Sequence, residues 1–485
     1  MKKHLLTAAA ALLLLGTALA SCGETASDPV NAENPGNDTA AETAAVTETD
    51  VYDLVETPDL GGYTFRICNN TSNFAYQVID LDEATGEPLD DSIYRRNTEV
   101  EKALNITITA QDMAYNEVIT TLKNSVMAGD NAYDVYFDEI GQFLGNGIFN
   151  TYLTDMQSVS TIHYENPWWN VSAMDSIQID KRRFFLFNDI DVMFYECFGA
   201  FLYNKTMAAS YDMPDFYSLV DQGKWTLDVV KENMLAASSD LNGDGKFDSN
   251  DQYGCACFAS CMPGFFVAAN THFITKDADG KPVWGGLTER MTDVYNKICD
   301  CLFSNKDAIR TPGSPNLAEL DQHGIFHGGK SLFYFEPLGS AKKMRDVDFE
   351  VGVLPFPKYD EAQENYGSYI CNIAAACVVP ITCNDAEKMG SILEVMAAYS
   401  NKYVRPAYFD TTLNFKYAQD ETSQKMLDII LTGGEFELGT VYNWGNLGTQ
   451  LTSLIQSPSD KWASTFEKIN DKVKAAIEKT INSET

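Results

Sequence analysis

The feature that most limits the possible folds is a regular alternation of strand-like and helical stretches early in the chain. Strand patterns at 63–70, 106–112 and 133–139 are separated by helical patterns at 92–105 and 116–130. Helices that join successive strands produce parallel winding of a sheet. The sequence therefore predicts an α/β fold, in which ligands bind at the carboxyl ends of the strands.

Polar side chains lie at two of these strand ends. Asn69 and Asn70 end the first strand pattern, and Asp138 and Glu139 end the third. The carboxyl ends of parallel strands share one edge of a sheet. We therefore expect these four residues to contribute to a binding site.

The N-terminus has the pattern of an export signal. Lys2 and Lys3 precede an apolar run at 5–15, and Leu19-Ala20-Ser21-Cys22 follows. Small residues directly before a cysteine resemble a bacterial lipobox, which implies a signal peptide at 1–21 and a diacylated Cys22. The expected location is the extracytoplasmic face of the cell membrane, with the lipid as anchor. The alternative is an ordinary secretory signal with a chance cysteine.

A flexible spacer is expected after this signal. Residues 23–50 are acidic and contain no basic or aromatic residue. Such a segment cannot bury enough apolar surface to offset its chain entropy. Residues 22–56 are therefore predicted to be a disordered linker. The rest of the chain exceeds the usual size of one core, which favours two lobes.

The charge balance limits the possible partners. The chain has 69 acidic and 35 basic residues, a formal net charge of −34. This excess argues against nucleic acid, which requires basic patches, and it favours an uncharged ligand over an anionic one. Aromatic residues make up 12% of the chain and offer flat surfaces for stacking.

The second part of the chain repeats the strand and helix patterns. Predicted strands lie at 182–189, 331–337, 349–359 and 372–380, and predicted helices begin at Leu227 and span 386–400 and 462–481.

Four segments, taken in order, resemble one protein family. FLYNKTM (201–207), GKWTLDVV (223–230), LPFPKY (354–359) and YNWGNL (442–447) are similar to segments of the extracellular solute-binding proteins of family 1. These are lipoprotein receptors of ABC importers for sugars and oligosaccharides. The resemblance implies a two-lobed periplasmic-binding-protein-like fold of type II, with a hinge of crossing strands and a ligand cleft between the lobes.

The resemblance also implies boundaries. Lobe one would be 57–200 with 368–405, and lobe two would be 204–362 with 408–485. The chain would cross between lobes near 203–205, 355–359 and 403–408. Crossings of this kind permit hinge closure around a ligand.

The function implied by the resemblance is capture of a carbohydrate, with oligosaccharide expected, and delivery to membrane permease subunits by a monomeric receptor. A receptor for peptides or another non-sugar solute is one alternative. A surface-anchored enzyme acting on glycosides is another, because paired carboxylates can hydrolyse glycosides. The catalytic motifs G-x-S-x-G, H-E-x-x-H and G-x-x-x-x-G-K-[ST] do not occur, so the sequence predicts a binding protein and no organic cofactor.

Further ligand-binding residues follow from the family likeness. A sugar presents apolar faces and hydroxyl groups, so aromatic plates and charged acceptors are expected. Trp444 would be an aromatic platform with core packing as the alternative, and Phe335 and Glu336 would form a wall. The remaining candidates are Tyr195 and Glu196 at the hinge floor and Trp168.

Residues 240–251, DLNGDGKFDSND, match the spacing of a calcium loop. The expected ligands are Asp240, Asn242, Asp244, the Lys246 carbonyl, Asp248 and Asp251, with Gly245 at the turn. Position twelve is Asp rather than Glu, and the following residues do not have a helical pattern. We expect a structural calcium ion rather than a sensor. The alternative is an ion-free turn rich in Asx hydrogen bonds.

Overall fold

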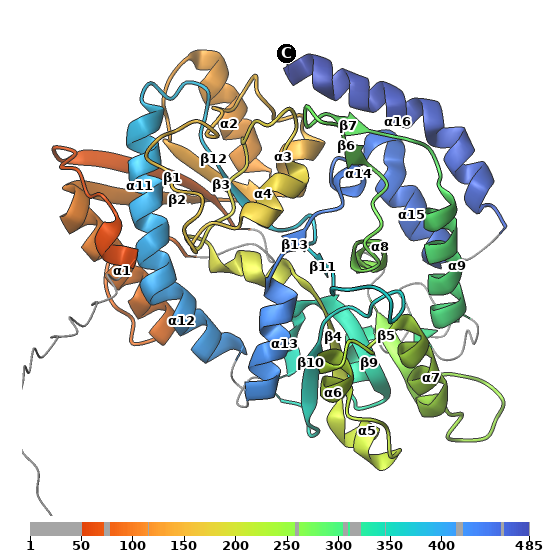
Figure 1. Cartoon of the computed structure of the whole chain (residues 1–485). Helices are drawn as coiled ribbons and strands as arrows, with labels where there is room; N and C mark the ends of the chain where they lie inside the picture. Colours follow the sequence, from red (N-terminus) through yellow and green to blue (C-terminus); the bar gives the residue numbers. More distant parts are fainter. Residues whose placement is uncertain are drawn as a thin grey trace, which may run out of the picture. The chain divides into compact units, whose positions relative to one another are not determined.

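The computed structural model describes most of the chain (Figure 1). The described residues are 51–71, 78–114, 116–257, 261–303, 309–310, 322–344, 346–413, 421–456 and 460–484. The predicted signal peptide, Cys22 and most of the predicted linker lie outside them. Contacts gather Asp50–Thr485 into one compact unit, which contains two main sheets.

The first sheet is parallel, as predicted, except at one edge. Its strand order is β12-β3-β1-β2, and β1 runs parallel to both β2 and β3. β12 is antiparallel to β3 and comes from much later in the chain. The strands are β1 (Tyr63–Asn70), β2 (Ile106–Met113), β3 (Val135–Glu139) and β12 (Ala375–Val378).

The helices between these strands end where the backbone turns left-handed. α1 (Pro88–Leu104) joins β1 to β2 and is capped by Asn105 at φ 52°. α2 (Glu117–Ala128) joins β2 to β3 and is capped by Gly129 at φ 67°. Asparagine and glycine tolerate this conformation better than other residues. α11 (Ala386–Tyr399) packs against α1.

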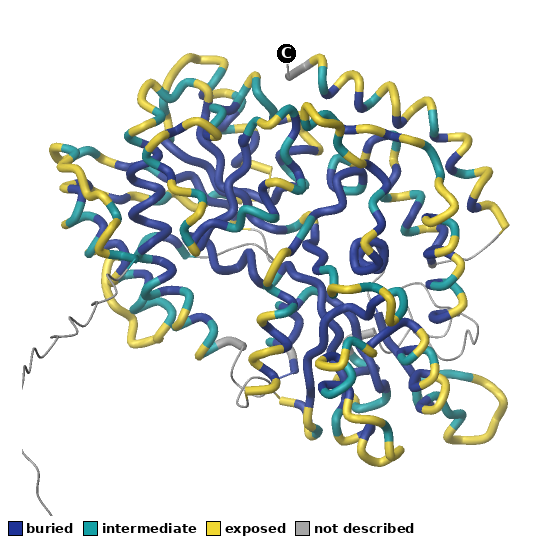
Figure 2. Tube along the Cα trace, in the orientation of Figure 1, coloured by how far each residue is buried: buried dark blue, intermediate teal, exposed yellow. Residues whose placement is uncertain are grey.

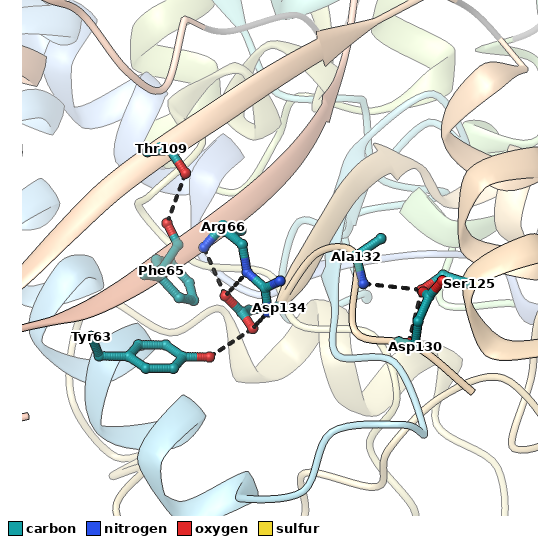
Figure 3. A network of polar contacts seen from close by, with 8 residues as sticks. All are labelled: Tyr63, Phe65, Arg66, Thr109, Ser125, Asp130, Ala132 and Asp134. Carbon is teal, nitrogen blue, oxygen red and sulfur yellow. Dashed lines mark hydrogen bonds and ion pairs between the residues drawn. The ribbon is translucent and has the colours of Figure 1, made fainter. Parts of the chain in front are cut away.

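A polar network at the amino-terminal end of the first sheet fixes the loop before β3. Asp134 accepts hydrogen bonds from the Tyr63 hydroxyl at 2.7 Å and from the Arg66 guanidinium at 2.8 Å (Figure 3). The Ser125 hydroxyl, in α2, bonds to the same loop: it donates to Asp130 at 2.5 Å and accepts from the Ala132 amide at 3.2 Å (Figure 3). These bonds hold the start of β3 to β1 and to the end of α2.

The second sheet is mixed, with order β10-β4-β9-β5-β8. β4 is antiparallel to both β9 and β10, whereas β5 runs parallel to β9 and β8. Its strands are β4 (Gly199–Asn204), β5 (Tyr253–Cys257), β8 (Ile309–Arg310), β9 (Ser331–Pro337) and β10 (Val351–Leu354).

Aromatic rings fill the core of the second sheet. Phe201 lies 5.1 Å from both Phe335 and Phe356, measured between ring centroids. The Trp225 indole N–H donates to the Pro355 carbonyl at 2.9 Å. Burial of each such ring stabilises the fold by roughly 1.5–3 kcal/mol. Figure 2 shows buried residues concentrated along the strands of both sheets.

The other elements surround the sheets and join them. They are η1 (Val51–Leu54), α3 (Ile140–Gly145), α4 (Val171–Ile177), η2 (Val192–Cys197), α5 (Lys205–Ser210), α6 (Phe216–Asp221), α7 (Leu227–Ala237), α8 (Gly264–Ala268), β6 (Thr275–Lys276), β7 (Pro282–Val283), α9 (Glu289–Phe303), α10 (Gln322–His327), η4 (Leu338–Met344), β11 (Ser368–Tyr369), η5 (Ser400–Val404), α12 (Arg405–Tyr408), η6 (Phe409–Leu413), α13 (Glu421–Leu431), β13 (Gly434–Glu435), α14 (Leu438–Val441), η7 (Trp444–Asn446), α15 (Leu447–Gln456) and α16 (Trp462–Glu484). Among the described helices, we find none that is both long enough and apolar enough to cross a membrane.

The chain passes between the two sheets through several segments. The first passage is η2, because β4 already belongs to the second sheet from Gly199. This is earlier than the expected crossing at 203–205, since Tyr203 and Asn204 complete β4. Asn204 also caps the start of α5, where its side-chain oxygen accepts the Met207 amide at 2.8 Å. The lobe boundaries themselves stay a prediction.

The predicted strand at 182–189 is not a regular strand. Arg182, Leu186 and Asn188 each form an isolated bridge, and each bridge has a different partner segment. The apolar side chains between them are buried, as the pattern indicated. A segment that changes partner every few residues cannot continue a ladder, so burial alone does not make it a strand.

Candidate functional site

The carboxyl end of the first sheet places buried polar groups beside one another. Asp138 is 1% exposed, and one of its carboxylate oxygens accepts the Glu139 amide at 2.8 Å. The other oxygen is buried and has no hydrogen-bond partner among the described residues. Burial raises the pKa of Asp138 to about 7, while the hydrogen bond from the Glu139 amide opposes the rise and the Glu139 carboxylate adds to it. Near neutral pH, Asp138 therefore holds its proton in part of the molecules.

The two predicted asparagines bond within the first sheet. The Asn69 side-chain amide donates to Asp112 at 3.0 Å, and the Asn70 amide donates to the Phe137 carbonyl at 3.4 Å. Both side chains are fully buried. In this structure they hold the strand ends together.

Backbone hydrogen bonds connect the end of β3 to the passage between the sheets. The Ile140 amide donates to Ala374 at 2.8 Å, and the Cys371 amide donates to Cys197 at 2.9 Å. The Leu338 amide in turn donates to the Phe198 carbonyl at 2.7 Å. The end of β3, the entry to β12, the end of η2 and the start of η4 therefore meet in one place.

Four charged side chains lie near enough to Cys197 to influence the pKa of its thiol. Glu139, Asp191 and Glu196 each raise the pKa of the Cys197 thiol, after burial as the main cause, and Lys342 lowers it. We call Glu139, Asp191, Glu196 and Lys342 the seam cluster. The sequence pointed to Glu139 and Glu196, but gave no signal for Asp191 or Lys342, which depend on the folded geometry.

Glu196 links the seam cluster to α12. It forms an ion pair with Lys342 and accepts the Tyr408 hydroxyl at 3.0 Å. Gly339 permits this approach, because a Cβ there would lie 2.7 Å from a Glu196 carboxylate oxygen. Lys342 keeps 35% of its side chain exposed and Glu196 keeps 12%. The pair is thus partly accessible at the passage between the sheets.

The seam cluster contains more acidic than basic groups, and two of its acids, Glu139 and Asp191, are buried. Burial raises the pKa of Asp191 to about 7, Glu196 adds to the rise, and Arg96 opposes it. Three carboxyl groups and one ammonium group offer strong acceptors and one strong donor. Such a set suits a ligand with several hydroxyl groups better than an anion.

Tyr195 does not share the exposure of its neighbour Glu196. Its hydroxyl donates to Asp189, and the ring is 6% exposed. The Asn401 amide donates to the same Asp189 carboxylate at 2.6 Å. Tyr195 therefore belongs to a buried network behind the seam cluster.

The expected wall at Phe335 and Glu336 lies in the core of the second sheet. Phe335 has no exposed surface, and its ring centroid is 5.0 Å from that of Phe265. Glu336 is 7% exposed and accepts the Tyr334 hydroxyl. Because phenylalanines cover the Phe335 ring, it is not available for stacking in this structure.

The two candidate tryptophans also pack internally. Trp444 stacks on Tyr442 with centroids 4.5 Å apart, and its indole N–H donates to Thr480 at 2.9 Å. Trp168 has no exposed surface and stacks on Tyr52 at 5.9 Å. For Trp444 this is the core packing that the sequence left open. The hydrogen bond from Trp444 to Thr480 holds η7, which precedes α15, against α16.

The loop at 240–251 directs its acidic side chains onto its own backbone. Asp240 accepts the Gly243 amide at 2.7 Å and the Gly245 amide at 2.8 Å. Asp251 is fully buried and accepts the Leu241 amide at 2.9 Å and the Asp248 amide at 2.8 Å. Gly245 has φ 78°, which favours glycine.

This geometry is that of an Asx-rich turn. In the part of the chain that the structure describes, no group of three or more His, Cys, Asp or Glu residues is placed to hold a metal ion. The loop leads into β5 and not into a helix, as expected from its sequence. A calcium ion bound by Asp240, Asn242, Asp244, the Lys246 carbonyl, Asp248 and Asp251 stays a prediction.

Comparison with known proteins adds evidence on the fold. No protein-family model and no curated protein sequence matches the chain. Solved structures do match. UspC of M. tuberculosis is 14% identical with a TM-score of 0.56, over 85% of this chain and 100% of UspC. The cyclic alpha-maltosyl-1,6-maltose binding protein of Arthrobacter globiformis is 12% identical with a TM-score of 0.56, over 86% and 100%.

A third structure shows the same likeness. The maltose/maltodextrin-binding domain MalE of Bdellovibrio bacteriovorus, bound to maltotriose, is 15% identical with a TM-score of 0.50, over 86% of this chain and 100% of that domain. Identities this low establish the fold alone. They confirm the predicted α/β fold, which is the two-lobed, periplasmic-binding-protein-like fold of these binding proteins.

Proposed function

We propose that this chain, which has the fold of sugar-binding proteins of ABC transporters, is a solute-binding receptor that captures a carbohydrate. The observation that carries the proposal is the seam cluster, where Glu196 and Lys342 pair at the passage between the two sheets. The proteins with this fold from Arthrobacter and Bdellovibrio are named for binding, or are bound to, sugars built from glucose units. An oligosaccharide is the expected ligand here.

The seam cluster supplies both kinds of polar contact that a sugar requires. Glu139 and Glu196 would accept hydrogen bonds from ligand hydroxyl groups, and Lys342 would donate one to a hydroxyl or ring oxygen. The groups come from β3, η2 and η4, so a ligand that contacts all of them joins β3 of the first sheet to the segments that precede β4 and follow β9 of the second. Capture would then stabilise the closed arrangement through the ligand's higher affinity for it.

Membrane attachment and delivery are further parts of the proposal. The small residues before Cys22 support a lipid anchor on the extracytoplasmic face, with residues 23–50 as a spacer. A monomeric receptor on such a tether would deliver its ligand to permease subunits of an importer. Mass spectrometry of the mature N-terminus tests the anchor, because an unmodified cysteine there would contradict it.

A glycan screen by thermal shift tests the binding function. A ligand that binds only the native state raises the unfolding temperature. We expect a shift with one class of neutral oligosaccharides and none with peptides. A shift with peptides alone would favour the peptide-receptor alternative. Turnover of glycosides that is lost on changing Glu139 or Glu196 would instead favour an enzyme.

Variants of the seam cluster test the site. Glu196→Gln and Lys342→Met each remove a charge-assisted hydrogen bond, which contributes about 1.5–3 kcal/mol, so affinity should fall roughly 10- to 100-fold. Glu165→Gln is the matched control, since the Glu165 side chain is 79% exposed. Isothermal titration with the best glycan measures the change. Unchanged affinity in both seam variants would contradict this placement of the ligand.

A further inference from the structure

A cavity lies elsewhere in the molecule, and no residue of the seam cluster lines it. It has a volume of 460 Å³ and is lined by Tyr52, Asn401, Arg405, Phe409, Gln424 and Asp428, among others. One wall is η5 and α12, which pack against α1 beside the first sheet. The opposite wall is α13, which packs against β10 of the second sheet.

Arg405 presents its guanidinium group to this cavity. The guanidinium carbon lies 5.3 Å from the ring centroid of Tyr195 and 5.5 Å from that of Phe409. Across the residues the structure describes, no side chain forms an ion pair with Arg405 within 4.0 Å, and no hydrogen bond from its guanidinium occurs. The group is half-buried. A half-buried guanidinium without an acceptor is uncommon, because its donors lose water without replacement.

One acid close to Arg405, Asp189, is already bonded to other donors. Asp189 is fully buried and accepts the Tyr195 hydroxyl and the Asn401 amide, the latter at 2.6 Å. Tyr52 fixes Asn401 in turn by donating to its side-chain oxygen at 2.5 Å. Arg405 is close enough to lower the pKa of Asp189, against the dominant effect of burial. The Asp189 carboxylate thus attracts the Arg405 guanidinium electrostatically but accepts no hydrogen bond from it.

The local backbone explains how Arg405 reaches the cavity. α12 is preceded by one π-helical segment, η5, and followed by another, η6. A π turn inserts an extra residue and changes the side-chain register, and such turns are frequent at functional sites. The aromatic faces of Tyr195 and Phe409 then fix the plane of the guanidinium.

We propose that this cavity is a binding site for a small organic acid with a single carboxylate, held by the fork of Arg405. A planar guanidinium held by aromatic rings matches a carboxylate with two parallel hydrogen bonds. The volume of 460 Å³ is larger than one inorganic ion needs and suits an organic molecule. Asp410 and Asp428 on the wall disfavour a second negative charge. They suit N–H or O–H groups on the rest of the ligand.

The probes are pyroglutamate, benzoate and lactate as carboxylates, pyroglutamide as the uncharged partner of pyroglutamate, and inorganic phosphate. Titration of the purified, sugar-free protein, followed by NMR or calorimetry, measures binding. We expect at least one carboxylate to bind and pyroglutamide to bind at least tenfold more weakly than pyroglutamate. Failure of all three carboxylates, or tighter binding of phosphate, would overturn the proposal.

Variants assign the binding to Arg405. Arg405→Gln should weaken the carboxylate at least tenfold, and Asp428→Asn should strengthen it a few-fold because a repelling charge is removed. Thr432→Trp fills the cavity from an exposed wall position and should also block binding, which protects the test if Arg405→Gln folds poorly. The control is Arg290→Gln, since Arg290 also lies over a tyrosine ring, at 3.9 Å from the Tyr359 centroid, but donates to the Ala269 carbonyl. Equal binding by wild type, Arg405→Gln and Thr432→Trp would refute the site.

Discussion

Two inner strands, β3 and β9, have similar sequences and different environments. β3 reads VYFDE and β9 reads SLFYFEP, so each places aromatic residues before an acid at its carboxyl end. At β3 the acids Asp138 and Glu139 lead into the seam cluster. At β9 the aromatic residue Phe335 disappears into a core of rings, and Glu336 is bonded to Tyr334.

The difference shows that a pattern of aromatic residues followed by an acid indicates where a strand ends. It does not indicate whether the acid is available to a ligand or packed in the core. β3 ends beside β12 and the passage between the sheets, where charged groups from other segments arrive. β9 lies between β4 and β5, both of which carry buried side chains, so its rings pack on their neighbours. The covering elements, which come from distant parts of the chain, decide the role of each acid.

The largest expected effect tests the core assignment of β9. Phe335→Ala should lower the free energy of unfolding by about 3–5 kcal/mol, because it leaves a cavity among packed rings. Urea unfolding followed by circular dichroism measures it. A ligand-stacking Phe335 would instead give a loss of sugar affinity with a stability change below about 1 kcal/mol.

The next effect tests the acid at the end of β3. The folded-state pKa of Asp138 is raised from 3.8 to about 7, so the stability contributed by its protonated form is fully present below about pH 4. That stability is lost as the pH rises through about 7, an effect of about 2–4 kcal/mol. Asp138→Asn should flatten the decline in stability between pH 4 and pH 7.

Asp191→Asn offers an independent check of the same idea. Its pKa is also raised to about 7 by burial, so it should flatten the same range of pH. Glu165→Gln, at an exposed position, is the control for the removal of an acid. If stability depended on pH in the same way in the wild type and in both aspartate variants, these two buried acids would not differ from an exposed acid, and the prediction would be wrong.

The loop at 240–251 gives a third environment for acids, because its carboxylates accept hydrogen bonds from backbone amides. Asp251→Asn should cost about 1–2 kcal/mol, because the carboxylate is buried and accepts two amides. Thermal unfolding in the presence of a chelator measures it. If the free energy of unfolding changed no more than it does for a surface substitution, these hydrogen bonds would contribute little to the stability of the protein.

The smallest effect concerns Asp240 and calcium. Without calcium, Asp240→Asn should change stability by less than about 1 kcal/mol, because the side chain is only partly buried and asparagine keeps an oxygen that can accept an amide of the turn. If the loop binds calcium, protein purified without chelator should contain about one ion per chain, and the variant should contain less. Metal analysis decides this. Absence of calcium even after its addition would leave the Asx-rich turn as the whole explanation.

Local sequence patterns predicted helices and strands well where the packing of the folded chain favours the same structure as the pattern. β1 and β9 have the expected bounds, and α16 begins at the expected Trp462. Alternation or helical periodicity is strong in each of these, and tertiary contacts agree with it. The segment 182–189 failed because an apolar run is equally compatible with buried irregular chain.

The candidate site was predictable only in part. Glu139 could be proposed because it ends a recognisable strand pattern, and Glu196 because it precedes the expected crossing between lobes. Lys342 and Arg405 were missed, since their significance comes from partners far away in sequence. In the structure, the aromatic candidates Phe335 and Trp444 lie in packed interiors. This could not be predicted, because the sequence does not indicate which side chains cover the faces of a ring.

The antiparallel partner of β3 has a consequence for biogenesis. β12 begins at Ala375, after every strand of the second sheet has been made. During synthesis of the chain, β3 is therefore an open edge while about half of the chain is still to be made. The first sheet can be completed only after every strand of the second sheet has been synthesised, so chaperones that hold unfolded chains have most to protect in that interval. Slowing translation just before residue 375 would lengthen the interval and raise the fraction of chains that aggregate.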